Sequence, residues 1–408
     1  MRLSPARVAL VLAAAVAISP VARAEDPAAK AQAALDKGLA FLKANQQPDG
    51  GWQKSDREPI GITGLVLRAF VDDGKDTSKT DFIAKGFDKL LSYQMQDGGI
   101  YKNLLANYNT AICTSTLVAA KDPALQPQID KAVAYLKQLQ WTAETKPEYI
   151  APPGKPVDQN TGKQVVSSDT DPWAGGWGYG GQGHSPAGQG RPDLSNTQFA
   201  VEALKDAGVS PDDPAMKNAL KFIARCQNNS ETNDQAWAGN DGGFIYGPSN
   251  DRKGESDSGE TTEGGKRRIR TMGSMSYAGL KSMIYAGLGK DDPRVKAVWT
   301  WVNKNFTLEE NVGRANADPK DAKAGLFYYY LMMARALHAY GEPMLVDDAG
   351  RKTDWRLAMI DKLTSTQKAD GSWVGISQEM ENNPVLVTAY SAMALENVIA
   401  DLKVHPAQ

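Results

Sequence analysis

The 408-residue chain carries 46 basic and 48 acidic residues, which leaves a formal net charge of only −2. This mild acidity excludes the strongly basic surface that proteins use to bind nucleic acids or anionic membranes. Two cysteines, Cys113 and Cys226, are too few for a disulfide scaffold. Because both lie in apolar helical patterns, we expect two buried, unpaired thiols.

The first 24 residues have the pattern of an export signal. Arg2 and Arg7 precede a short apolar run, and residues 22–24 read A-R-A, a typical cleavage site. The apolar run is too short to span a bilayer, although a signal anchor is the alternative interpretation. We therefore expect a signal peptide over residues 1–24 and an exported chain, periplasmic or extracellular, without a stable membrane span after cleavage.

From residue 25 onward, helical periodicity dominates and strand-like alternation is nearly absent. The twelve predicted helices cover approximately residues 30–46, 60–73, 80–95, 107–120, 125–140, 194–207, 214–228, 269–287, 292–305, 324–340, 353–367 and 385–400. The even-numbered helices are rich in small and apolar residues, whereas the odd-numbered ones carry a charged stripe. Since helices that are apolar nearly all round are buried and striped ones lie outside, we predict six pairs of an outer and an inner helix.

Helical pairs of this kind must stack, because one pair cannot bury its own apolar face. Six pairs can close into a ring, so the predicted fold is an all-α, α6/α6 toroid, with residues 25–408 as one domain. Two outer-to-inner connections are long, at about residues 141–192 and 229–267. Both fall at the end of the ring where the inner helices begin, and a cavity is expected to open there.

A short motif follows five of the six outer helices and reads Q-x-x-D-G-G-W in its fullest form. It is carried by Gln46, Asp49, Trp52, Gln94, Asp97, Trp177, Asp241, Gln367, Asp370 and Trp373. Glutamine and aspartate can satisfy exposed backbone groups at helix ends, and glycine permits a sharp reversal. Tryptophan can fill the seam between pairs. The fifth pair, near residues 305–313, lacks the motif.

With this motif and six helical pairs, the chain resembles the squalene cyclase and prenyltransferase repeat family, as a divergent exported member. The resemblance covers nearly all of the chain after residue 24, and it implies a terpenoid cyclase-like toroid in which the motif is a structural clasp. Residues 175–204 are similar to the region where class II triterpene cyclases carry a D-x-D-D-T acid motif. On that mapping Asp193 and Thr197 match, whereas Ser195 replaces the proton-donating aspartate and Asn196 replaces the third one.

This replacement argues against proton-initiated cyclisation, which needs clustered carboxyl groups that keep one of them protonated. Aspartate, serine and asparagine are also preferred helix N-caps, so Asp193, Ser195 and Asn196 have a structural explanation. We name no catalytic residue. Zinc, which the protein prenyltransferase branch uses, needs three or four converging ligands. The three histidines and two cysteines do not form such a set, so we expect neither metal nor cofactor.

Side chains on the inner helices are the candidates for lining a central cavity. Aromatic rings there could stabilise cations, as the rings of cyclases do. The candidate lining residues are Phe199, Glu202, Tyr277, Tyr329 and Tyr390. Of the four consecutive aromatic residues at 327–330, we expect two to face the cavity, because successive helical residues lie about 100° apart.

Three functions remain open, and whether the chain is an enzyme is open with them. The first is a toroid without proton-initiated cyclase activity that binds an apolar small molecule, such as an isoprenoid, or a protein. The second is a divergent terpenoid-metabolising enzyme that acts on an isoprenoid. The third is a secreted carbohydrate-active enzyme, which needs two carboxylates facing one cleft. Its candidate carboxylates are Asp169, Asp171, Glu202 and Asp241.

Overall fold

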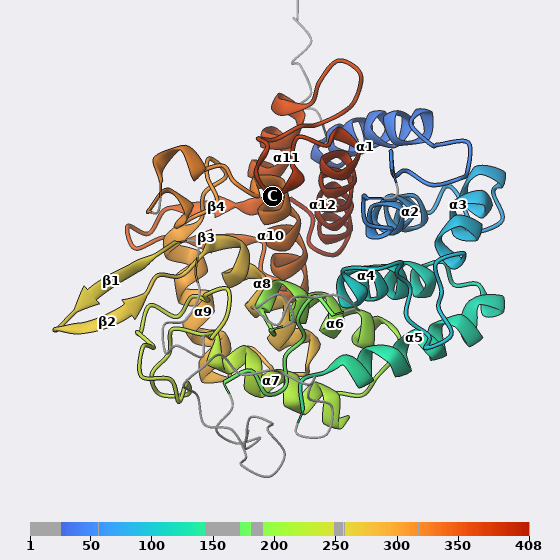
Figure 1. Cartoon of the computed structure of the whole chain (residues 1–408). Helices are drawn as coiled ribbons and strands as arrows, with labels where there is room; N and C mark the ends of the chain where they lie inside the picture. The colour runs from blue at the N-terminus through green and yellow to red at the C-terminus, as the bar shows by residue number, and fades with distance from the viewer. Residues whose placement is uncertain are drawn as a thin grey trace, which may run out of the picture.

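The helices form two concentric rings, which are seen end-on in Figure 1. The computed structural model describes residues 26–55, 57–142, 172–180, 191–248, 256, 258–316 and 318–407. The outer helices in these ranges are α1 (Pro27–Ala44), α3 (Asp81–Leu91), α5 (Gln126–Leu139), α7 (Pro214–Arg225), α9 (Pro293–Asn305) and α11 (Trp355–Thr366). The inner helices are α2 (Gly61–Asp73), α4 (Ala106–Ala119), α6 (Leu194–Asp206), α8 (Gly273–Tyr285), α10 (Leu326–Tyr340) and α12 (Pro384–Val404).

The inner helices contact one another in chain order, and the last one returns to the first. Helix α2 packs on α4, α4 on α6, α6 on α8, α8 on α10 and α10 on α12, which packs on α2 again. The first outer helix, α1, lies against the last outer helix, α11, and against the last inner helix, α12. Because the ring closes, no helical pair is left with an apolar end. The α6/α6 toroid predicted from the sequence is therefore the fold observed.

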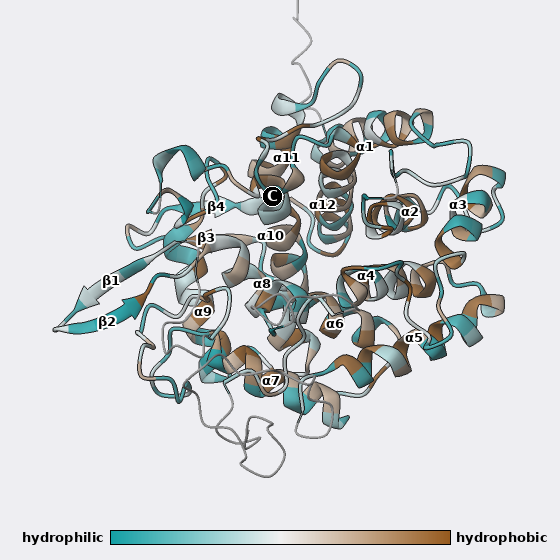
Figure 2. Cartoon of the chain, in the orientation of Figure 1, coloured by the Kyte–Doolittle hydropathy of each residue, from teal (hydrophilic) through white to brown (hydrophobic). Residues whose placement is uncertain are grey.

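The two rings differ in composition as the periodicity predicted. Figure 2 shows mostly hydrophobic inner helices and outer helices that alternate hydrophobic and hydrophilic residues. The outer helix α3 buries one face, formed by Ile83, Gly86, Phe87 and Leu90. Among the described residues α12 is the one helix long and apolar enough to cross a membrane, but 83% of its most apolar window is buried inside the ring. This burial is typical of a core helix.

The repeated glutamine joins a helical pair to the next one at five of the six junctions. The side-chain amide of Gln46 donates to the Gly50 carbonyl (2.8 Å) and to the Phe82 carbonyl (2.7 Å) in the first turn of α3. The same two bonds, to the glutamine's own turn and to the next outer helix, are made by Gln94, Gln140, Gln227 and Gln367. Since the bond of Gln367 reaches α1, the sixth pair is joined to the first.

The first glycine of each motif turn lies against the backbone of the neighbouring outer helix. At Gly50 φ is +89°, and a Cβ atom would lie 2.4 Å from the Lys85 carbonyl oxygen. At Gly175 φ is +94°, and the corresponding distance to the Asn218 carbonyl oxygen is 1.9 Å. Only glycine fits such an approach, so these turns fix how closely neighbouring pairs pack. We call the glutamine, this glycine and the following tryptophan position the clasp.

The tryptophan of the clasp ties the outer helix to its own inner helix. The Trp52 indole N–H donates to the Leu42 carbonyl at the end of α1 (2.6 Å), and its backbone N–H donates to the Thr63 hydroxyl in α2 (2.9 Å). The same pair of contacts is made by Trp177 with Leu136 and Thr197, and by Trp373 with Leu363 and Thr388. Each tryptophan thus ties its own pair together, and the rings of Trp52 and Trp373 also lie against Gly86 in α3 and Gly38 in α1, in the seam between pairs.

Two short hairpins are features that the sequence did not predict. Strands β3 (Met344–Val346) and β4 (Lys352–Asp354) pair between α10 and α11, where β3 packs on α9 beside the missing fifth clasp. Strands β1 (Glu260–Glu263) and β2 (Lys266–Ile269) form a second hairpin that projects from the ring (Figure 1). Because β2 ends at Ile269, the prediction that the eighth helix begins there is wrong by four residues.

The two cysteines are buried and unpaired, as expected. Cys113 lies in α4 and Cys226 directly follows α7. Burial raises the pKa of both thiols, which keeps them protonated at neutral pH.

A comparison of two glycines tests the clasp. Gly74 also has a positive φ (+76°), but nothing lies within 4 Å of a Cβ placed there. Replacing Gly74 with alanine should therefore cost about 1 kcal/mol of unfolding free energy through backbone strain alone. Gly50→Ala should cost roughly 3 kcal/mol or more, because the added carbon also displaces α3. Urea denaturation of both variants gives the two values, and equal losses would contradict the role of close approach.

Candidate functional site

A cavity of about 450 Å³ opens at the end of the ring where the inner helices begin. Every inner helix contributes lining residues from its first two turns, and loops complete the rim, which we call the mouth. The inner-helix lining residues are Ile62, Tyr108, Ser195, Phe199, Ser274, Met275, Tyr328, Leu386 and Tyr390. Since each inner helix delivers its N-terminal end to the same place, closure of the ring itself builds this cavity.

Aromatic rings pack against one another in the cavity walls. Phe199 lies at the centre of the floor, where its ring meets Tyr108 edge-on at 5.4 Å between centroids and Tyr328 at 6.2 Å. Tyr328 in turn packs on Tyr390 at 6.0 Å. Methionine side chains complete the apolar part of the lining. The polar groups are the tyrosine hydroxyls, such as that of Tyr179, and the side chains of Ser195, Ser274, Asn311, Arg314 and Glu379.

Two of the predicted lining residues do line the cavity, and two others do not. Phe199 and Tyr390 face it, whereas the prediction for Tyr277 and Tyr329 is wrong. Those two rings pack against each other at 5.5 Å between centroids, within the wall between α8, α9 and α10. The Tyr329 hydroxyl donates to the Thr307 carbonyl (2.9 Å), away from the cavity.

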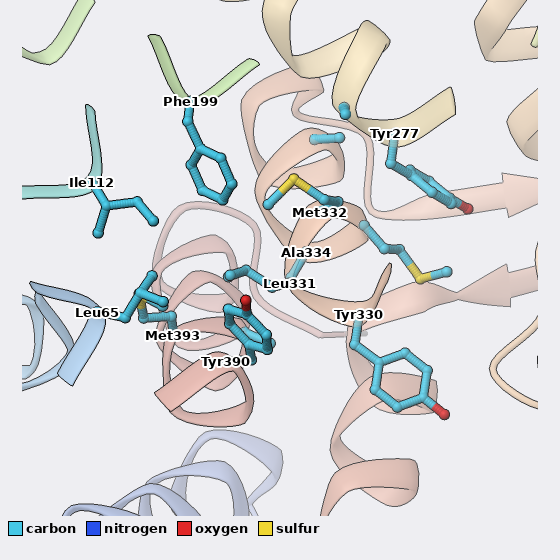
Figure 3. Packing of buried hydrophobic residues seen from close by; sticks show 14 of the residues in the cluster. Leu65, Ile112, Phe199, Tyr277, Tyr330, Leu331, Met332, Ala334, Tyr390 and Met393 are labelled. Carbon is cyan, nitrogen blue, oxygen red and sulfur yellow. The ribbon is translucent and has the colours of Figure 1, made fainter. Parts of the chain in front are cut away.

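The rotation of α10 about its axis explains why Tyr328 lines the cavity and Tyr329 does not. Figure 3 shows Phe199 and Tyr390 on one side of the packed inner helices, with Tyr277 and Tyr330 on the other. Of the four consecutive aromatic residues at 327–330, Tyr328 is the one that lines the cavity, not the two that we expected.

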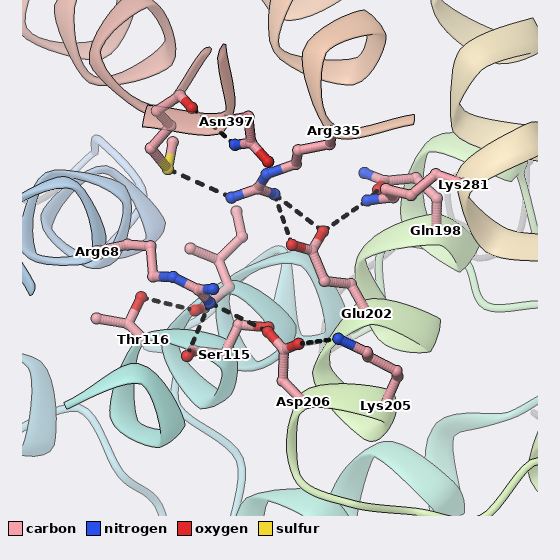
Figure 4. Close-up of polar contacts among 12 residues, drawn as sticks. Arg68, Ser115, Thr116, Gln198, Glu202, Lys205, Asp206, Lys281, Arg335 and Asn397 are labelled. Carbon is pink, nitrogen blue, oxygen red and sulfur yellow. Dashed lines mark hydrogen bonds and ion pairs between the residues drawn. The ribbon is translucent and has the colours of Figure 1, made fainter. Parts of the chain in front are cut away.

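Glu202 was predicted to line the cavity, but it lies beneath the floor. It is 4% exposed, and its carboxylate accepts from Lys281 Nζ (2.5 Å) and from Arg335 (2.7 Å), as Figure 4 shows. Burial alone would raise the pKa of this carboxyl, but the charges of Arg335 and Lys281 outweigh it and lower the pKa to about 2. Glu202 therefore balances buried cations and has no direct contact with the cavity.

A second group of charges occupies the same interior. Arg68 bonds to Asp72 (2.6 Å) and to Asp206 (3.1 Å). We refer to Arg68, Asp206, Glu202, Lys281 and Arg335 as the charge network. The space between its two halves is only about 10 Å³, too small for a ligand. Together with Phe199, the charge network closes the ring below the cavity.

The four positions that align with the cyclase acid motif serve different purposes. Asp193 caps α6, because its carboxylate accepts from the Asn196 backbone N–H (2.7 Å) and side-chain amide (2.8 Å). The Thr197 hydroxyl accepts from the Trp177 backbone N–H (3.0 Å), which is the clasp contact described above. Ser195 faces the cavity, 3.3 Å from the Tyr328 hydroxyl. Three of the four residues thus build the helix start, and only Ser195 is available to a ligand.

A strained loop at the mouth is a feature that sequence reasoning missed. Among the described non-glycine residues four have a positive φ, and three of these line the cavity: Leu105 (57°), Glu379 (57°) and Met380 (61°). Each such conformation costs about 1 kcal/mol and accumulates at functional sites. Glu379 also pairs with Arg314 across the mouth at 3.4 Å. No periodicity or motif marks this loop in the sequence.

The neighbouring Glu381 is buried and holds the start of α10. Its Oε1 accepts from the backbone N–H groups of Phe327 (2.8 Å) and Tyr328 (2.9 Å). Burial raises the pKa of this carboxyl to about 7, although the backbone bonds oppose that rise. The position of Tyr328 in the cavity wall therefore depends on Glu381.

The remaining predicted acids do not meet in the cavity. Asp241 lies in its clasp turn, where it accepts from the Gly243 backbone N–H (2.9 Å) and the Thr271 hydroxyl (3.0 Å). Asp169 and Asp171 lie outside the described residues. Within the described ranges no cluster of three or more histidine, cysteine or acidic side chains could hold a metal ion.

Known proteins share the fold with this chain. No protein-family model and no curated protein matches the sequence. An inactive variant of alpha-1,6-mannanase GH76A of Salegentibacter sp. HEL1_6, in complex with alpha-1,6-mannotriose, is 10% identical, with a TM-score of 0.53 over 92% of this chain and 100% of that one.

Two further solved structures are less similar in shape. The type II terpene cyclase MstE from Scytonema is 11% identical, with a TM-score of 0.49 over 92% of this chain and 99% of that one. A protein from Actinoplanes is 15% identical, with a TM-score of 0.49 over 90% and 99% of the two chains. At this level of identity the mannanase match shows an α/α toroid and assigns no activity.

The raised pKa of Glu381 predicts a pH-dependent stability. Its carboxyl binds a proton more tightly in the folded chain, with a pKa of about 7, than at its ordinary value of 4.5. As pH rises through this window the unfolded chain loses its proton first, so the stability falls. Between pH 5 and pH 8 the wild type should lose about 2 to 3 kcal/mol relative to Glu381→Gln. Urea denaturation at both pH values measures this difference, and parallel profiles would refute the assignment.

Proposed function

We propose that this chain is an exported toroid that binds a predominantly apolar small molecule in the cavity at its mouth. The observation that carries the proposal is the cavity itself, about 450 Å³ in volume and lined by aromatic and methionine side chains together with a smaller number of polar side chains. Small-molecule sites have this size and this composition. Export rests on the signal-like pattern of residues 1–24.

The cavity lining favours binding over either enzymatic alternative. A terpenoid cyclase that starts by protonation needs a strong acid in its cavity, and at the aligned position this chain has Ser195. A glycoside hydrolase needs two carboxyl groups that flank the substrate. Among the described lining residues Glu379 is the one carboxylate, and it is paired with Arg314.

An isoprenoid is the ligand class that the cavity fits best. A flexible hydrocarbon with methyl branches can fill the irregular space between ring faces and methionine side chains such as Met275, which adapt to the shapes of ligands. The tyrosine hydroxyls would leave room for one polar end group. A sugar, by contrast, would require many hydrogen-bonding partners, and the apolar floor at Phe199 offers none.

Mass spectrometry of the protein purified from its native host, under non-denaturing conditions, tests whether a ligand is bound. We expect a co-purifying lipid-like molecule at a stoichiometry near one per chain. Recovery of an empty cavity together with partner proteins would refute small-molecule binding and favour a scaffold instead.

A cavity-filling substitution locates the binding. Ser195→Phe places a large ring in the cavity and should weaken binding of the C15 alcohol farnesol at least tenfold, as measured by isothermal titration calorimetry. Ser365→Phe makes the same change on the exposed face of α11 and should bind like the wild type. Equal binding by both variants, or binding of alpha-1,6-mannotriose in place of farnesol, would contradict the proposal.

A further inference from the structure

A chain of buried polar side chains connects the charge network to the cavity wall. Lys281 Nζ bonds to both Glu202 and the Gln198 side-chain oxygen Oε1. The side-chain nitrogen Nε2 of Gln198 lies 3.3 Å from the Tyr328 hydroxyl, which lies 3.3 Å from the Ser195 hydroxyl. Gln198 and Lys281 are fully buried, whereas Tyr328 and Ser195 line the cavity. This row of side chains thus begins at a cation and ends at the cavity wall.

Chemistry fixes the direction of the bonds that Gln198 makes in this chain, whereas either hydroxyl can be the donor between Ser195 and Tyr328. An ammonium group has only donors, so the Gln198 atom that faces Lys281 must be the oxygen. The amide nitrogen of Gln198 then faces Tyr328 and must donate to its hydroxyl oxygen. Because that oxygen accepts from Gln198, the hydroxyl proton of Tyr328 is not used by Gln198 and can be donated to Ser195 or to an acceptor in the cavity.

Lys281 can hold the Gln198 amide in this orientation at neutral pH, because it is charged there. Burial lowers the pKa of its ammonium group to about 8, while the neighbouring carboxylate of Glu202 opposes that fall. At pH 7 the side chain is therefore still mostly charged. Burial also raises the pKa of the Tyr328 phenol, so Tyr328 stays a neutral donor.

We propose that the Ser195–Tyr328 corner binds a hydrogen-bond acceptor oxygen of the ligand, and that Lys281 and Gln198 position the Tyr328 hydroxyl to donate to it. This inference rests on the proposed function and narrows the ligand class to an apolar molecule with an uncharged carbonyl or ether oxygen. A ligand that carries an ammonium group is disfavoured, because it meets donors at this corner and has the Lys281 cation behind them.

Three probes with one C15 skeleton test the inference by calorimetry at pH 7. Farnesal has an acceptor oxygen and no donor, farnesene has neither, and farnesylamine carries an ammonium group. For the wild type we expect farnesal to bind about tenfold more tightly than farnesene, which is the usual effect of one hydrogen bond in a buried site. Farnesylamine should bind most weakly.

Variants then test whether Tyr328 and Lys281 cause the tighter binding of farnesal. Tyr328→Phe should bind farnesal and farnesene equally well, with the affinity for farnesene unchanged. Lys281→Met leaves the Glu202–Arg335 pair in place and frees Gln198 to turn, so it should reduce the preference for farnesal without removing farnesene binding. Tyr330→Phe is the matched control, because it removes a buried hydroxyl from the same helix outside the cavity.

The outcomes separate the two proposals. Equal affinities of the wild type for farnesal and farnesene would overturn the acceptor site and leave the proposed function standing. An unchanged preference in Tyr328→Phe would do the same. If none of the three probes binds to the wild type, the proposed function fails and the acceptor site fails with it. Should Lys281→Met not fold, Tyr328→Phe and its control still decide the question.

Discussion

The fold depends on the close approach of a turn glycine to the backbone of the neighbouring outer helix. At Gly50 and Gly175 there is no room for a Cβ atom, so the distance between successive helical pairs is fixed by main-chain contact. The clasp glutamine holds this distance with bonds to both pairs. Because the same geometry recurs, the pairs rotate by a constant amount and the ring closes after six. One junction, between the fifth and sixth pairs, has no clasp, and there the β3–β4 hairpin packs between α9 and α11.

Ring closure has two consequences for the interior. It brings six inner-helix N-termini to one end, where their first turns surround the cavity. It also encloses the middle of the ring, which has to be filled. The chain fills it with the charge network rather than with apolar side chains alone. Buried charges of this kind cost free energy unless they are paired, and here Glu202 meets two cations and Arg68 meets two carboxylates.

Periodicity was sufficient to predict the twelve helices and the toroid, because a repeated unit shows its pattern many times. The candidate site was less accessible to sequence reasoning. Whether Tyr328 or Tyr329 faces the cavity depends on the rotation of α10, and one residue changes the direction by about 100°. Glu202 pairs with residues on α8 and α10, which lie far away in the chain, so its partners could not be inferred. Glu379 and Glu381 lie in a loop, where no periodic signal exists. The clasp residues could be recognised since their contacts are local and repeated.

In the part of the chain that the structure describes, Phe199 and the charge network form a floor that makes the toroid a cup and not a tube. A ligand would have to leave by the route through which it arrived, past Leu105, Glu379 and Met380 at the mouth. The lifetime of any complex is then governed by this rim and not by the depth of the cavity. The backbone strain stored in the rim lowers the free energy needed to move it away from the observed conformation, while the rest of the ring stays closed.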